Sequence, residues 1–174
     1  MKRVTVITSA SGNGGTTFSR ELAARLGVPF HELDALFWRP GWTETPANEL
    51  RALVEPIVTT DAWVIDGKYY GRLGDLAFRN ADLVVWLDLP IHVWLPRLLK
   101  RTFWRAVTRE KLWNGNRESF RSAFLSRNSI FLFALRSYRP RRRSYPERLA
   151  AFPHVRLHSK REVERFLSSA SRAP

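Results

Sequence analysis

The residues with the clearest chemistry lie in the segment SASGNGGT, which covers residues 9–16. Gly12, Gly14 and Gly15 allow successive backbone N–H groups to turn inward on an anion. A helix is predicted directly after them, and its N-terminus adds the positive end of a helix dipole. The segment is therefore a candidate phosphate loop. The alternative is a glycine-rich turn that only joins a strand to a helix.

The full phosphate-loop motif has the form G-x-x-x-x-G-K-[ST]. Its four fixed positions fall on Ser9, Gly14, Gly15 and Thr16, so two match and two differ. Gly15 replaces the lysine that contacts the β- and γ-phosphates, whereas Thr16 keeps the hydroxyl that binds Mg²⁺. Losing one charge-assisted hydrogen bond of about 1.5–3 kcal/mol weakens binding roughly ten- to a hundredfold without abolishing it. The residues predicted to hold the donor phosphates are Gly12, Asn13, Gly14, Gly15, Thr16 and Thr17.

Two aspartates follow predicted strands. Asp34 follows the strand predicted at 28–33, and Asp66 follows the one at 62–65. Because the carboxyl ends of parallel strands face the ligand crevice of an α/β sheet, Asp34 is a candidate ligand contact or else a helix or turn cap. Asp66 is a candidate Mg²⁺ ligand, partly through water. Lys68 is predicted to supply the cation that the loop lacks, or to be a solvated turn lysine.

Arginines recur on the helix predicted at 92–107. Arg97, Arg101 and Arg105 are spaced i, i+4 and i+8, which places three guanidinium groups on one face. Because like charges at this spacing repel, an anionic partner is favoured over a solvated stripe. The polar segment 108–118 that follows, TREKLWNGNRE, has Asn-Gly turn chemistry and is predicted to be a lid over a nucleotide.

Two further segments leave alternatives open. The aromatic and proline cluster around Arg39, in LFWRPGW, is predicted either to wall an acceptor pocket or to cover the core. The basic segment from Arg136 to Arg148 is predicted either to track a nucleic-acid backbone or to reach back to a bound nucleotide.

Length and composition favour one domain with an anionic partner. The chain has 174 residues, 29 Lys and Arg against 16 Asp and Glu, and a formal charge of +13. That charge favours phosphate, nucleotide or nucleic acid as a partner. The absence of cysteine excludes disulfides and thiolate metal sites. We find neither a signal peptide nor a membrane-spanning stretch, so we expect a soluble cytoplasmic protein with no membrane partner.

Hydrophobic patterning predicts strands that alternate with helices. Such alternation indicates an α/β fold with a parallel sheet and right-handed crossovers, in which the ligand lies at the strand ends. The tail SSASRAP is expected to be frayed. The predicted strands are 4–8, 28–33, 62–65, 83–89 and 155–158, and the predicted helices are 17–26, 45–57, 92–107, 120–138 and 159–167.

Taken together, the loop SASGNGGTT, the segment LDALFWRPGW, the strand ends WVIDGKY and LDLP, and the arginine-rich helix resemble the small adenylate-kinase-like P-loop kinases. Proteins of this kind are often labelled adenylate kinase or topology-modulation (FlaR-related) proteins. The resemblance covers nearly the whole chain. It implies a three-layer P-loop fold with a five-stranded parallel sheet of nucleoside-monophosphate-kinase type, in one domain at 1–170 with a helical lid at about 106–119 and a frayed tail at 171–174.

The resemblance also implies a function. ATP would be the donor and Mg²⁺ the cofactor, and a nucleotide or other small molecule would accept the phosphoryl group. Arg97 and Arg101 would face the adenine and the phosphates, with Asp66 organising Mg²⁺ together with Thr16. Asp34, Arg39 and Lys68 would lie on the acceptor side. Two residues depart from the family pattern, since Gly15 replaces the lysine and Lys68 stands where asparagine is expected. A non-catalytic nucleotide-binding protein and a nucleic-acid-binding protein remain the alternatives.

Overall fold

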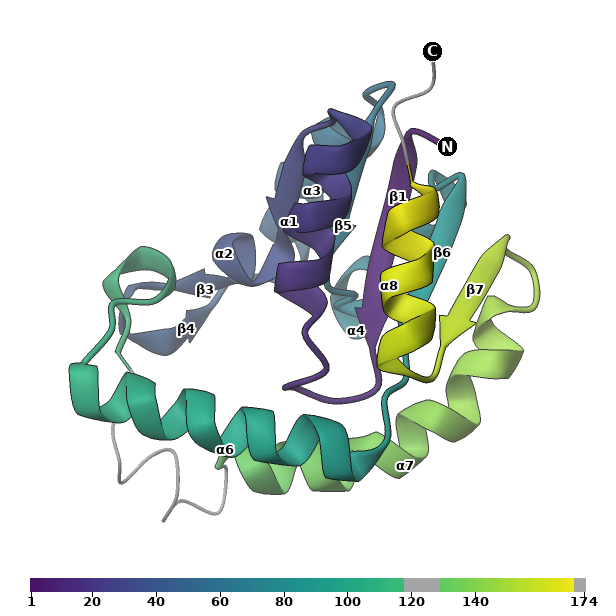
Figure 1. Ribbon diagram of the computed structural model, residues 1–174. Helices are drawn as coiled ribbons and strands as arrows, with labels where there is room; N and C mark the ends of the chain where they lie inside the picture. The colour runs from purple at the N-terminus through teal and green to yellow at the C-terminus, as the bar shows by residue number, and fades with distance from the viewer. Residues whose placement is uncertain (118–128, 171–174) are drawn as a thin grey trace.

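A computed structural model describes residues 1–117 and 129–170 (Figure 1). Its centre is a five-stranded sheet in which every neighbouring pair is parallel. The strand order is β2-β5-β1-β6-β7, so the first strand lies in the middle. The predicted α/β fold with a five-stranded parallel sheet is confirmed. The strands are β1 (Arg3–Thr8), β2 (Phe30–Glu32), β5 (Trp63–Asp66), β6 (Leu83–Leu87) and β7 (His154–Leu157).

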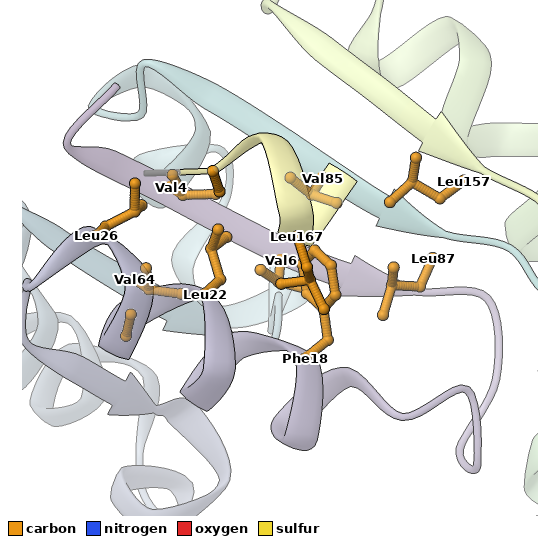
Figure 2. Packing of buried hydrophobic residues seen from close by; sticks show 12 residues of the cluster. Val4, Val6, Phe18, Leu22, Leu26, Val64, Val85, Leu87, Leu157 and Leu167 are labelled. Carbon is orange, nitrogen blue, oxygen red and sulfur yellow. The ribbon is translucent and has the colours of Figure 1, made fainter. Parts of the chain in front are cut away.

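One face of the sheet is covered by α1 (Gly15–Leu26) and α8 (Lys160–Ser169). Val4 and Val6 of β1 point to this face and pack with Leu22 of α1 and Leu167 of α8 (Figure 2). The N-terminus of α8 is closed by a capping box, in which Ser159 Oγ accepts from Glu162 N at 3.2 Å. The sequence predicted a helix here, at 159–167.

The opposite face is covered in two parts. Ile65 of β5 packs under α3 (Ala47–Val58), and Ile7 of β1 packs with Tyr145 and Leu149 of α7 (Ile130–Leu149). Two short helices, α4 (Tyr70–Leu73) and α5 (Leu76–Arg79), connect β5 to β6. Alternate residues of β1 therefore enter different cores, which is why its central residues 4–7 are all buried.

Helix α6 (Ile91–Thr108) runs past the carboxyl ends of the strands, below the loop that joins β1 to α1 (Figure 1). Trp94 and Leu98 of α6 are fully buried, and they pack with Ala10 of that loop and with Tyr138 of α7. The loop is thus held between the strand ends and two helices.

Several element boundaries differ from the sequence prediction. The strand predicted at 28–33 covers only Phe30–Glu32, because Leu33 already belongs to helix α2 (Leu33–Phe37). The aromatic segment around Arg39 forms an antiparallel hairpin, β3 (Trp38–Arg39) and β4 (Thr43–Glu44), around the short 3₁₀ helix η1 (Pro40–Trp42). In α3, Leu50 and Val54 belong to the buried face, whereas Leu53 is 48% exposed.

The basic segment 136–148 lies inside α7, which continues through Pro140 and Pro146. The predicted helix 120–138 and the end of the predicted lid fall partly on residues 118–128, outside the described residues, as does the predicted tail at 171–174. Ser168 and Ser169, which were expected in the frayed tail, belong to α8. Within the described ranges, no helix is both long enough and apolar enough to cross a membrane.

Candidate active site

The loop between β1 and α1 has the backbone that an anion site needs. Gly12 and Gly14 adopt φ angles of +90° and +84°, which favour glycine. A Cβ on Gly12 would also lie 2.5 Å from the carbonyl oxygen of Trp94, so α6 approaches the loop as closely as backbone allows. Phe18 N makes the first intrahelical bond of α1, to Gly14 O at 2.9 Å. The amides of Gly15, Thr16 and Thr17 precede it and are those that a helix N-terminus offers to an anion.

The side chain of Asn13 makes its hydrogen bonds within the protein. Its Nδ2 donates to Ala10 O at 2.9 Å, and its Oδ1 accepts from Leu89 N at 2.9 Å. Asn13 is 2% exposed. The side chain and the backbone N–H of Asn13 both make hydrogen bonds within the protein, and its contact with the donor phosphates stays a prediction.

The place of the missing loop lysine is sterically closed. A Cβ on Gly15 would lie 2.8 Å from Thr8 Cγ2 and 3.0 Å from Asp66 Oδ1. The glycine is thus matched to its neighbours, and any side chain at this position requires Thr8 to move. The sequence showed the lysine to be absent but could not show this crowding, because Thr8 and Asp66 belong to different strands.

Oxygen atoms gather around Thr16 at the first turn of α1. Its Oγ1 lies 2.7 Å from Asp66 Oδ2 and 3.2 Å from Glu32 Oε1. Burial raises the pKa of Asp66 to about 7, and the negative charges of Asp34 and Glu32 act in the same direction. Thr16 and Asp66 were predicted from the sequence, but Glu32 was missed. Its position at the end of β2 could have indicated that it belongs to the site.

These residues fit a Mg²⁺ ion that keeps much of its water. Their donors are all oxygen, the type that Mg²⁺ prefers. No group of three or more acidic or histidine side chains in the described residues is arranged to hold a metal by itself. A protein that offers one or two carboxylates leaves the remaining positions to water and substrate phosphates, which is the usual arrangement for Mg²⁺ in phosphotransferases.

Asp34 lies on α2, beside Tyr69. The Tyr69 hydroxyl donates a hydrogen bond to Asp34 Oδ1. Burial raises the pKa of Asp34, despite that hydrogen bond and the nearby guanidinium groups of Arg101 and Arg105. Two of the three predicted stripe arginines are therefore placed beside an acidic group of the site. Tyr69, which follows Lys68 and has a positive φ of 32°, was not singled out from the sequence.

The third stripe arginine lies against the loop. Arg97 Nη1 is 3.8 Å from the position that a Cβ on Gly14 would take. Arg97, Arg101 and Arg105 all border one large cavity together with the loop. The predicted placement of these three side chains on one face of α6 is confirmed, and that face is the one turned toward the loop.

The aromatic segment both enters the core and borders the cavity. Phe37 of α2 is buried in the core and reaches the cavity, and Trp38 and Trp42 of the hairpin border the same cavity. The described part of the predicted lid docks on this hairpin, since Asn116 Oδ1 accepts from Trp42 N at 2.9 Å. Arg39 pairs instead with Glu49 of α3 and is not among the described residues that border the cavity.

A buried carboxylate that the sequence analysis did not assign supports the start of the loop. The Asp88 side chain, after β6, is 0% exposed. Ser9 Oγ donates to Asp88 Oδ1 at 2.6 Å, and Trp86 Nε1 donates to Ser9 Oγ at 2.8 Å. Arg142 of α7 and Arg156 of β7 bind the other carboxylate oxygen at 3.0 and 2.6 Å. Ser9, which replaces the first glycine of the motif, thus ties the loop to β6, β7 and α7.

The cavity has a volume of about 1880 Å³ and extends from the loop to Asp34 and on to α7. Single ligands usually occupy about 300–1,000 Å³. The space is therefore sufficient for a donor and an acceptor side by side.

Solved structures of kinases have the same fold. A shikimate kinase from Acinetobacter baumannii, in complex with shikimate, aligns with a TM-score of 0.59 and 16% identity over 97% of this chain and 92% of that one. The chain has the fold of the small P-loop kinases. A gluconokinase from Sinorhizobium meliloti aligns with a TM-score of 0.54 and 19% identity over 96% and 91% of the two chains.

A deoxyadenosine kinase from M. mycoides with bound dATP also shares this P-loop kinase fold, with a TM-score of 0.54 and 12% identity over 95% and 97% of the two chains. No protein-family model and no curated protein matched the sequence. The resemblance to the FlaR-related proteins in particular therefore stays a prediction.

Proposed function

We propose that this protein is a Mg²⁺-dependent P-loop phosphotransferase that moves the γ-phosphoryl group of ATP to a small acceptor. One observation carries the proposal. The loop amides, the Thr16–Asp66–Glu32 oxygen cluster and the arginines of α6 all border the same cavity. Phosphoryl transfer needs positioning and charge neutralisation rather than a covalent intermediate on the enzyme. These three groups supply both.

On the donor side, the amides of Gly15, Thr16 and Thr17 would bind phosphate oxygens at the N-terminus of α1. Arg97, which lies beside Gly14, would add positive charge there. Mg²⁺ bound near Thr16 and Asp66 would neutralise the charge that develops on the phosphate oxygens.

On the acceptor side, Asp34 would receive the proton of an acceptor hydroxyl. The new bond would join the acceptor oxygen to the γ-phosphorus, the bond between the γ-phosphorus and the β,γ-bridging oxygen would break, and ADP would leave. The raised pKa of Asp34 favours this role, because a general acid or base works best when its pKa approaches the working pH. Tyr69 holds the carboxylate in position through its hydrogen bond.

ATP binding is the direct test. Calorimetric titration with ATP in Mg²⁺ at moderate salt should show saturable binding at one site, and Thr16→Val should weaken it at least about tenfold through the loss of one charged contact. An acceptor screen over nucleoside monophosphates, sugars and sugar acids then follows. Absence of binding up to millimolar ATP would overturn the proposal, whereas binding without transfer to any acceptor would favour the non-catalytic alternative.

The crowding at Gly15 gives a second prediction. Gly15→Lys alone should not accelerate transfer, because its Cβ meets Thr8 Cγ2. The pair Thr8→Ser and Gly15→Lys removes that methyl group, so the new lysine gains room and can reach the phosphates. We expect the double variant to transfer roughly 10- to 100-fold faster than Thr8→Ser alone, as one charged hydrogen bond predicts. Steady-state kinetics with ATP measures this, and a double variant no faster than Thr8→Ser would contradict it.

The nucleic-acid alternative remains only a prediction. Within the segment 136–148, Arg142 pairs with buried Asp88, Arg141 Cζ lies 5.2 Å over the Phe133 ring, and Arg148 Cζ lies 4.5 Å over the Tyr70 ring. These guanidinium groups are engaged within the fold and face different neighbours. No observation specifically favours a nucleic-acid backbone as their partner.

A further inference from the structure

Five aromatic side chains border the cavity near Asp34 and contact one another in series. The series begins at Tyr69, whose hydroxyl is bonded to Asp34, and the centres of successive rings lie 4.1, 4.8, 5.4 and 6.4 Å apart. The rings come from three parts of the chain that are distant in sequence, and we call them the aromatic wall. In order along the series they are Tyr69, Phe37, Trp38, Trp42 and Trp113.

The tryptophans of the aromatic wall leave ring surface open to the cavity. Phe37 and Tyr69 are inclined by only 31° and cover each other's faces. Trp38 and Trp113, by contrast, each meet Trp42 at 80°, in edge-to-face contacts that cover at most one ring face each. Trp42 is 36% exposed. A flat ring that enters the cavity can therefore stack on one tryptophan with its edge against the next, and aromatic pairs prefer these two arrangements.

The last ring of the wall comes from the lid segment. Trp113 belongs to the 3₁₀ helix η2 (Trp113–Gly115), which lies beside β3 and β4 (Figure 1). Asn114 Nδ2 donates to Trp38 O at 2.5 Å. Asn116 is 4% exposed, and its Nδ2 donates to Arg39 O at 2.9 Å. The two asparagines thus hold Trp113 against the hairpin, and the wall is complete only while this part of the lid is docked.

The backbone is strained at three positions in the aromatic wall and its support. Among the described residues, four other than glycine have a positive φ, and three of them are Trp42, Tyr69 and Asn114, with φ angles of 57°, 32° and 55°. Side chains disfavour this conformation, bulky ones most of all. Strain of this kind persists where the surrounding structure holds it, and it gathers at ligand-binding segments. The fold therefore accepts strain to place two of the rings and the residue that holds a third.

The polar groups around the aromatic wall are engaged with one another. Arg105 Nε lies 3.6 Å from Glu110 Oε2, and Glu44 forms an ion pair with Arg72, so each of these charges has an opposite charge beside it. The two asparagines of the lid bind backbone groups, and neither is among the described residues that border the cavity. The wall therefore offers apolar ring surface rather than hydrogen-bond partners, and it suits a flat uncharged ring better than a polyol.

Lys68 directly precedes Tyr69 but contacts a ring outside the aromatic wall. Its Nζ lies 4.4 Å from the centre of the Tyr145 ring of α7. The two roles expected for Lys68, as a substitute for the loop lysine and as an acceptor contact, stay predictions.

We infer that the aromatic wall binds a flat, uncharged aromatic ring of the acceptor. The acceptor is then a nucleoside or an aromatic alcohol rather than a sugar or a sugar acid. Its ring stacks on the tryptophans while its hydroxyl is directed to Asp34. The hydroxyl oxygen bonds to the γ-phosphorus of ATP, its proton passes to Asp34, and ADP leaves. That the ring belongs to an acceptor rests on the proposed function, whereas the ring site itself does not.

Calorimetric titration tests the site by comparing hydroxyl compounds with and without an aromatic ring, while Mg²⁺ and β,γ-imido-ATP fill the donor site. Adenosine and benzyl alcohol represent the two sources of a ring, and glucose and gluconate are the controls that lack one. We expect at least one ring compound to bind about tenfold or more tightly than either control, because stacking on an aromatic side chain contributes on that scale. Tighter binding of adenosine assigns the site to a nucleoside, and tighter binding of benzyl alcohol assigns it to a smaller alcohol.

Tryptophan variants test whether the aromatic wall makes the contact. Trp113→Leu keeps an apolar side chain but removes the ring, and it should weaken binding of the ring compound about five- to tenfold. Trp113→Phe keeps a ring and should retain most of the affinity. The matched control is Trp104→Leu on α6, which should leave the affinity unchanged, because Trp104 is 62% exposed and is not among the described residues that border the cavity. Asn114→Gly keeps the positive φ but loses the amide that holds the lid, and it should weaken ring binding about threefold or more.

The inference is wrong if glucose binds as tightly as both ring compounds, or if Trp113→Leu and Trp104→Leu have the same effect. It is also wrong if β,γ-imido-ATP abolishes ring binding, which would place the ring in the donor site. None of these measurements requires phosphoryl transfer. Ring binding that depends on Trp113 in a protein that fails to bind ATP would leave the ring site standing and remove the proposed kinase activity. ATP binding without binding of either ring compound would remove the ring site alone.

Discussion

Asp66→Asn is expected to give a protein that is more stable at pH 8 and transfers phosphate far more slowly. The pKa of Asp66 is raised from 3.8 to about 7 in the folded protein, chiefly by burial. The folded carboxyl group therefore binds its proton more tightly than the unfolded one, and the protein loses stability as the pH rises from about 4 to about 7. Asparagine remains neutral and avoids this loss.

We expect Asp66→Asn to raise the free energy of unfolding by about 1–4 kcal/mol at pH 8, since one pKa unit corresponds to about 1.4 kcal/mol. The gain should vanish near pH 4. Transfer should fall by roughly 10²–10³ or more, because the site loses a charge that organises the transition state. Urea unfolding at several pH values and steady-state kinetics measure the two effects.

The matched control is Asp61→Asn, which makes the same change at an exposed position. It should alter neither stability nor activity. A variant Asp66→Asn that is less stable than the unaltered protein at pH 8 would contradict the assigned cause, because it would mean that the carboxylate stabilises the fold by its charge.

The second large effect is expected at Asp88. Asp88→Ala should lower the free energy of unfolding by about 2–4 kcal/mol, because removing one partner of a buried charged network leaves the others without a counter-charge. The value falls below that of a fully buried pair because the side chains of Arg142 and Arg156 are 41% and 30% exposed and can turn to water. Ser9 would also lose its acceptor.

ATP binding should weaken in the same variant, since Ser9 begins the phosphate loop. Asp88→Asn keeps an acceptor for Ser9. It should lose about as much stability as Asp88→Ala but retain more affinity for ATP. Asp75→Ala, which breaks the exposed pair with Arg79, should cost less than about 1 kcal/mol. Chemical denaturation and ATP titration of the three variants separate the two roles. Equal stability of Asp88→Ala and Asp75→Ala would refute the network's importance.

Much of the fold was predictable from the sequence because its signals are local. The apolar run 83–89 marks a buried strand, and the Ser159–Glu162 spacing marks a helix start. The predicted helix 120–138 overlaps the first part of α7, but its continuation to Leu149 was not anticipated, because Pro140 and Pro146 each remove a backbone donor. Its buried side chains, Tyr138 and Tyr145, are held by the sheet and α6, and tertiary packing overrides the local preference against helix.

The candidate site was predictable where one segment carries it, as in the loop and the arginine stripe of α6. It was not predictable where strands distant in sequence meet. Glu32 reaches Thr16 only because β2 pairs with β5, and Asp88 reaches Ser9 only because β6 pairs with β1. The pairing of Arg39 with Glu49 of α3 was likewise not visible in the sequence, and the expected place of Arg39 on the acceptor side stays a prediction.

The central position of β1 has a consequence for how the chain folds. The strand precedes both of its neighbours in the sequence, residues 63–66 and 83–87, and the loop that follows it is anchored through Asp88 to residues 142 and 156. Pairing across such sequence separations requires long loops to close and is slow compared with local contacts. The loop between β1 and α1 is therefore among the last parts of the protein to acquire its final shape, so that recovery of the proposed ATP binding during refolding should lag behind helix formation.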